Sequence, residues 1–237
     1  MALEAKKSLK RMRKTLSDGT AARGLEWVAG WLLQTNPHSR YGEVNFEIFE
    51  REAGKQIADS VRLGLSQVWR KQAPRFDEQQ PRTTYHIAAA GLQGLHLDLG
   101  LGDNLPSLTD AEIRRALHYG TFEINGYPKW FWPLVEAHPV IAASELQLIA
   151  SEAPNGPVST EHAEELFTSL AQAPTVIRES LSPSAWAYLA NAGPSHEYVS
   201  DKILQTVMSF PGAISRADFG RITMSKLEAS LQRTAAR

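Results

Sequence analysis

The stretch EIFEREAGKQIADSVRLGLSQVWRKQ, residues 47–72, decides the fold class because it carries the longest apolar period in the chain. Apolar side chains recur in it at steps of three and four residues: Phe49, Ala53, Ile57, Val61, Leu65, Val68 and Trp69. This spacing places one apolar stripe along one side of an α-helix. We therefore expect a long amphipathic helix over residues 47–72.

The helical period continues on both sides of this stretch, interrupted by proline, glycine and asparagine. Thr109 and Glu112 form a capping box, which starts a helix, and Ser182-Pro183 fits an N-cap followed by proline at the first helical position. We expect the other helices at residues 21–34, 82–97, 130–137, 140–151, 160–172, 174–181, 183–191, 195–210 and 215–233. Only residues 83–87 weakly suggest a strand. The pattern predicts an all-α protein of about 8–11 helices, either an irregular α-solenoid or a helical bundle.

A polar loop bounded by prolines, PRFDEQQP at residues 74–81, divides this pattern. We expect N-terminal helices with a basic arm over residues 1–73 and a helical-repeat-like region over residues 82–237. The two regions could also form one continuous domain, because no strict sequence period separates them.

Composition excludes several classes of function. The 237 residues contain 25 Lys and Arg against 26 Asp and Glu, and no Cys. The absence of Cys excludes disulfides, thiolate zinc sites and a cysteine nucleophile. No apolar run approaches the ~18 residues of a spanning helix. We expect a soluble, cytoplasmic protein without a membrane span.

Positive charge is concentrated at the start of the chain. Residues 1–14 carry one acid, Glu4, and six basic side chains: Lys6, Lys7, Lys10, Arg11, Arg13 and Lys14. Such an arm can contact phosphate or acidic lipid. It can also be a solvated helix whose Leu9 and Met12 touch a neighbour, and the lack of interleaved aromatic residues favours this second interpretation.

No sequence motif indicates catalysis or metal binding. The chain has no P-loop, no H-E-x-x-H and no G-x-S-x-G. The groups considered as possible ligands or catalysts are His96, Asp98 and Asp103, then His162, Glu164 and Glu165, then His118, His138, His196 and Glu197. We interpret them as helix-end, dipole-stabilised or structural residues. The sequence therefore predicts a non-enzymatic protein with no metal and no cofactor.

The most unusual segment is YGTFEINGYPKWFWP, residues 119–133, which is rich in aromatic residues. It could be an exposed recognition patch in which Tyr127, Trp130 and Trp132 bind a partner. It could instead be a helix–turn–helix corner, with Asn125-Gly126 as the turn, that Phe122, Trp130 and Phe131 lock together. We favour the corner, with at most Tyr127 and Trp132 exposed.

The stretch LTDAEIRRALHYGTFEINGYPKWF at residues 108–131, with LVEAHPV at residues 134–140, resembles a recurring element of one protein family. The family is the large bacterial STAND-type (NACHT-like) NTPases, whose C-terminal helical repeats contain this element. The resemblance is looser over residues 49–69 and absent from the end of the chain. It implies a sensor-like helical-repeat region from antiphage defence, without the Walker motifs or effector of that family, and it transfers no catalytic residue.

We therefore expect a helical-repeat scaffold or sensor segment that binds another protein, such as an NTPase or effector subunit or a foreign protein. Two alternatives stay open. One is an enzyme with a site assembled from scattered His and acidic residues. The other is a nucleic-acid or membrane-surface binder that uses the basic arm.

Overall fold

The computed structural model of the chain describes residues 1–35, 40–74, 86–100, 102, 105–123, 125–152, 157–191 and 197–209, with the isolated positions 215, 217, 220 and 224. Every regular element in these ranges is helical, which confirms the all-α prediction. The helices are α1 (Leu3–Arg11), α2 (Arg13–Ser17), α3 (Ala22–Thr35), α4 (Phe46–Ala53), α5 (Lys55–Lys71), α6 (His86–Leu99), α7 (Asp110–Gly120), α8 (Phe131–Ala137), α9 (Pro139–Glu152), α10 (Pro157–Ser169), the 3₁₀ turn η2 (Leu170–Gln172), α11 (Thr175–Asn191) and α12 (Glu197–Met208). None of these helices is long and apolar enough to span a bilayer.

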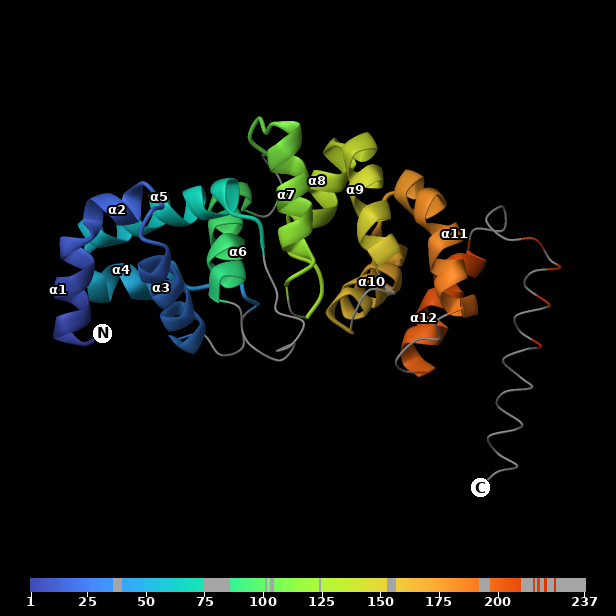
Figure 1. The fold of residues 1–237 in the computed structure, drawn as a ribbon, viewed down its shortest axis with the longest axis horizontal. Helices are drawn as coiled ribbons and strands as arrows, with labels where there is room; N and C mark the ends of the chain where they lie inside the picture. The colour runs from blue at the N-terminus through green and yellow to red at the C-terminus, as the bar shows by residue number, and fades with distance from the viewer. Residues whose placement is uncertain are drawn as a thin grey trace, which may run out of the picture.

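The helices are spread along the long axis of the molecule, from α1 at the N-terminal end through α6 and α7 to α11 and α12 (Figure 1). Helix α5 packs against α7, α7 against α9, and α9 against α11. In addition, α6 packs against α3 and α5, and α10 packs against α9 and α12. Each helix thus contacts mainly its near neighbours in sequence, which is the contact pattern of an α-solenoid.

The helix expected over residues 47–72 is in fact two helices, α4 and α5. Gly54 separates them with φ +92° and ψ 149°, a conformation that is essentially restricted to glycine. Its N–H donates to the Glu50 carbonyl at the end of α4, and its own carbonyl accepts from Ile57 and Ala58 at the start of α5. The apolar period passes through this break unchanged, so periodicity alone could not locate it.

Over residues 174–191, where we predicted two helices, the structure has one. We expected a break at Ser182-Pro183, but α11 runs through Pro183 without interruption. Ser182 is therefore not an N-cap; its buried hydroxyl donates to the Arg178 carbonyl at 2.6 Å. Pro183 lies on the exposed side of the helix, where water can satisfy the carbonyl that loses its usual N–H donor.

Two local predictions are confirmed. Thr109 and Glu112 make both hydrogen bonds of a capping box at the start of α7. Asn125 and Gly126 both have positive φ, 61° and 88°, as a tight turn at this position requires. Residues 82–85, 193–194, 211–212 and most of 215–233, where we also expected elements or breaks, lie outside the described residues.

The buried side chains form two clusters that meet at α6. We call them the N-terminal core, which contains residues of α1 to α5, and the C-terminal core, which extends to α12. Helix α6 contributes Ala89 and Ala90 to the first and Leu92 and Leu95 to the second. The small residues of α6 permit a close approach to α5, because a methyl group on Gly94 would overlap the Leu65 carbonyl oxygen. The division of the chain at residues 74–81 stays a prediction.

Candidate functional site

The aromatic segment is a packed corner of the C-terminal core. Phe122, Trp130 and Phe131 are buried there, as the structural interpretation expected. Tyr127, one of the two aromatic residues that this interpretation allowed to be exposed, is buried as well: its ring stacks on Phe131 with centroids 3.9 Å apart and planes inclined by 15°. Trp132 is half-buried and meets the Tyr127 ring edge-on at 5.4 Å. Tyr127 is therefore not an exposed aromatic residue, and its burial raises the pKa of the hydroxyl.

The residues before α4 hold this corner in place. The Arg40 guanidinium donates to the carbonyl oxygens of Tyr127 at 2.7 Å and Asn125 at 3.0 Å. In the opposite direction, the buried carboxylate of Glu123 accepts from the backbone N–H groups of Tyr41 and Gly42. These contacts join segments more than 80 positions apart, so no local pattern could have indicated them.

Asp98, which we expected at a solvated helix end, is a junction between helices. Its carboxylate accepts hydrogen bonds from the Ser66 hydroxyl, from Trp69 Nε1 at 2.8 Å and from Arg70. Arg70 also donates to Glu112 at 3.0 Å, so the network joins α5, α6 and α7. Asp103 lies outside the described residues. Within the described part of the chain, no group of three or more His, Asp or Glu side chains is arranged to hold a metal ion.

The acidic residues of α10 also differ from expectation. Glu164 is not in a helix start stabilised by the helix dipole, because α10 begins at Pro157; it is buried and accepts the Tyr188 hydroxyl at 2.6 Å. Glu165 accepts from Ser169 one turn later.

The histidines lie beside aromatic residues or helix ends. His118 and His162 flank Phe122, with ring centroids 5.7 Å and 4.8 Å away. Burial first, and then the charge of His118, lowers the pKa of His162 to about 4. Burial likewise lowers the pKa of His96. His138 is the C-cap of α8, Glu197 begins α12, and His196 lies outside the described residues.

The basic arm forms α1 and α2. Its apolar residues behave as expected: Leu9 and Leu16 are buried in the N-terminal core, and Met12 packs against it. All six basic side chains of the arm are exposed: Lys6, Lys7, Lys10, Arg11, Arg13 and Lys14. The arm is thus fastened to the fold while its cations face solvent.

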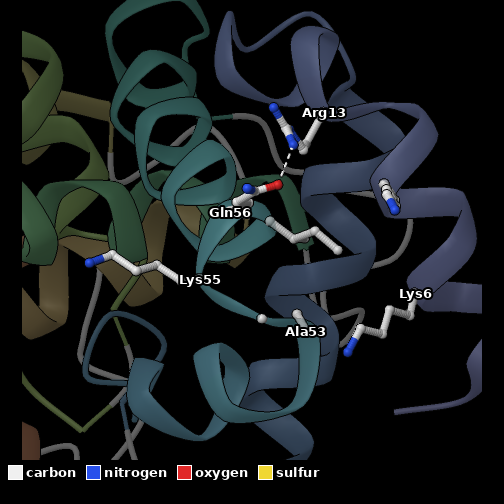
Figure 2. Close-up of a pocket in the computed structure, with 8 residues that line it drawn as sticks. Lys6, Arg13, Ala53, Lys55 and Gln56 are labelled. Carbon is white, nitrogen blue, oxygen red and sulfur yellow. Dashed lines mark hydrogen bonds between the residues drawn. The ribbon is translucent and has the colours of Figure 1, made fainter.

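Some of these cations border a hollow, which we call the basic hollow (Figure 2). It has a volume of about 320 Å³ and is lined by Lys6, Lys10 and Arg13 on one side and by Ala53, Gly54, Lys55, Gln56 and Ile57 on the other. Arg13 donates across it to Gln56 Oε1 at 2.7 Å, and Lys6 donates to the Glu52 carbonyl at 3.2 Å. The hollow therefore lies between the arm and the corner where α4 meets α5.

Sequence reasoning missed the second side of this hollow. Lys55 and Gln56 stand in the first turn of α5, inside what the apolar period predicted as one helix. Gly54 was a weak signal, because Gly inside an amphipathic pattern weakens the helix, but Gly64 lies in the same pattern and α5 continues through it.

A second surface feature lies on α9 and α11. The exposed residues of 139–151 and 175–190 are Val140, Ser144, Gln147, Leu148, Ser151, Thr175, Val176, Glu179, Ser180, Pro183, Ala187 and Ala190, and we call this set the α9–α11 face. Gln147 Nε2 donates to Ser184 Oγ at 2.8 Å and so links the two helices beside it. Glu179 is the one charged residue of the set, and the half-buried Glu145 and Arg178 are the other charged residues of 139–151 and 175–190.

The chain matches no protein-family model, no curated protein and no solved structure.

Proposed function

We propose that the chain is a non-enzymatic helical-repeat scaffold or sensor segment that binds another protein through the α9–α11 face. The observation that carries this proposal is the lack of charge on an exposed helical surface. Depletion of charged residues is the compositional signal of the centre of a protein interface.

The apolar members of the face support this proposal. Val140, Leu148 and Val176 have exposed fractions of 83%, 54% and 52%. Each would gain by burial against a partner, since every Å² of apolar surface removed from water contributes about 25 cal/mol. The surrounding serines and Gln147 can supply the hydrogen bonds of such an interface.

The kind of partner is proposed from the resemblance of residues 108–140 to the repeats of STAND-type NTPases. By that resemblance, the partner is an NTPase or effector subunit, or a foreign protein sensed in bacterial antiviral defence. The row of α7, α9 and α11 supports such a role because stacked helical repeats offer long surfaces to a partner.

The test is affinity capture from the source cells combined with crosslinking and mass spectrometry. Wild-type protein is compared with the variants Leu148→Glu and Val176→Glu, which place a charge on the α9–α11 face. The matched control is Leu63→Glu on α5, which changes an exposed leucine away from that face.

We expect a partner whose crosslinks map to α9 and α11, whose capture both face variants abolish, and whose capture Leu63→Glu retains. Equal capture by all four proteins, or crosslinks confined to other helices, would refute the proposal.

A further inference from the structure

We propose that the basic hollow is a binding site for an oligophosphate group, either a free oligophosphate or the di- or triphosphate of a nucleotide. This site is separate from the α9–α11 face, so the proposal does not depend on the protein-binding function. It rests on three cationic side chains, Lys6, Lys10 and Arg13, which border one cavity and form no ion pair with a carboxylate among the described residues.

The charge at the hollow is only partly compensated, because Glu52, which attracts Lys6, pairs with the N-terminal ammonium. In the described part of the chain, Lys6, Lys10 and Arg13 form no ion pair. The nearby acids are already engaged: Glu52 pairs with the N-terminal ammonium, Glu4 with Lys7, and Glu50 and Asp59 with Arg62. An anion that enters the hollow therefore displaces no carboxylate from these cations.

The two hydrogen bonds across the hollow position its donors without exhausting them. Lys6 uses one of its three N–H donors on the Glu52 carbonyl, and Arg13 uses one of its five on Gln56. Because Gln56 accepts through Oε1, its amide nitrogen keeps both of its donors. Lys10 makes no hydrogen bond within the described residues and is free to reach a ligand.

The opposite side of the hollow favours an anion as well. The N-cap of α5 is Gly54, which has no side chain that could accept from the first N–H groups of this helix. A Cβ on Gly54 would meet no atom within 4 Å, so the backbone is open to a ligand there. In Figure 2, the Lys55 side chain extends away from Arg13 and Lys6, and we assign it no contact.

The number of cations selects the ligand class. One phosphate group carries about two negative charges near neutral pH, fewer than the three cations of the hollow. A di- or triphosphate supplies the missing charge. A cavity of about 320 Å³ also has the size of a small-molecule site and leaves room for more than one phosphate.

The experiment is isothermal titration calorimetry of the full chain with tripolyphosphate, ATP, inorganic phosphate and a single-stranded oligonucleotide. Titrations at about 20 mM and about 150 mM salt separate electrostatic binding from other contributions. The test variants are Lys10→Gln and Gln56→Glu. Gln56→Glu keeps an acceptor for Arg13 but places a carboxylate in the hollow, and Lys10→Gln breaks no hydrogen bond of the fold.

The matched controls are Arg11→Gln and Lys14→Gln, which remove the same charge from the same two helices outside the lining of the hollow. We expect tripolyphosphate to bind more tightly than inorganic phosphate, and the two test variants to weaken it by about tenfold or more. The controls should weaken it by less than about twofold. ATP and tripolyphosphate binding equally would identify the phosphates as the recognised group, and tighter ATP binding would add a contact to the nucleoside.

Three results would overturn the proposal. The first is no binding of tripolyphosphate or ATP at low salt. The second is an equal loss in the control and test variants, which would show that the arm attracts anions without a defined site. The third is tight oligonucleotide binding with none of tripolyphosphate, which would show a nucleic-acid surface instead.

Discussion

The Tyr188 hydroxyl of α11 donates to the buried carboxylate of Glu164 on α10 at 2.6 Å. The pair lies between two helices of the C-terminal core, and the Tyr188 ring also packs against Phe167 with centroids 5.5 Å apart. Burial and the neighbouring carboxylate both raise the pKa of the Tyr188 hydroxyl, so it stays a donor throughout the ordinary pH range. A polar contact thus holds together a part of the chain whose sequence indicated only separate helices.

Tyr188→Phe removes the hydroxyl donor from this buried carboxylate while it keeps the ring. We expect the free energy of unfolding to fall by about 1–3 kcal/mol, measured by urea denaturation, because a buried carboxylate that loses this hydrogen bond keeps its desolvation penalty. Adding Glu164→Met should recover part of this loss, since the pair is then replaced by apolar groups. The control is Tyr198→Phe, because Tyr198 is exposed. Equal losses in Tyr188→Phe and Tyr198→Phe would contradict the role of the pair.

Trp130→Ala tests the packing of the aromatic corner. Trp130 is almost completely buried in the C-terminal core, so its truncation removes apolar contacts and leaves a cavity. We expect the free energy of unfolding to fall by about 3–5 kcal/mol, as for other large aromatic side chains in cores. Trp27→Ala is the matched control, because Trp27 is partly exposed on α3 and should lose less. A loss below about 1 kcal/mol for Trp130→Ala would mean that the corner is not held by this ring.

Gly126→Val tests the turn inside the corner. Gly126 has φ +88°, and a β-branched residue is strained in this region. We expect a loss of about 1–2 kcal/mol on thermal or chemical unfolding. Gly126→Asn should lose less, because asparagine tolerates positive φ. The same melting temperature for the valine variant and the wild-type protein would show that the turn adopts another conformation.

The features that sequence analysis predicted correctly are those determined by neighbouring residues. The capping box joins Thr109 to Glu112, three positions away, and the turn depends on the adjacent pair Asn125 and Gly126. Both follow from backbone chemistry that acts over one helical turn or less. The apolar period likewise located α3, because it reflects the buried side of the helix.

The features that sequence analysis missed depend on residues far apart in sequence. Asp98 appeared to be a helix-end residue because Ser66 and Arg70, its partners on α5, cannot be paired with it from spacing. The basic hollow was hidden for the same reason, since Arg13 meets Gln56 only after α4 and α5 fold back on the arm. Pro183 was misleading in another way: its exposed position lets the helix continue past a residue that usually ends one.

His162 gives the fold a dependence on pH. Its ordinary pKa is 6.5, and burial against Phe122, with the charge of His118, lowers the pKa to about 4 in the folded chain. As pH falls through 6.5, the unfolded chain takes up a proton that the folded chain does not. The contribution of the neutral His162 ring to the free energy of unfolding is therefore complete above pH 6.5. It is lost progressively as the pH falls toward 4.

Between about pH 7 and about pH 5, we expect this one group to lower the free energy of unfolding by about 2 kcal/mol. The measurement is urea denaturation at a series of pH values for wild-type protein and His162→Gln. His162→Gln should flatten the slope of stability against pH, whatever its effect on stability at neutral pH. His96, whose pKa burial also lowers, leaves a smaller residual slope. A slope that His162→Gln leaves unchanged would show that this ring is as readily protonated in the folded chain as in the unfolded one.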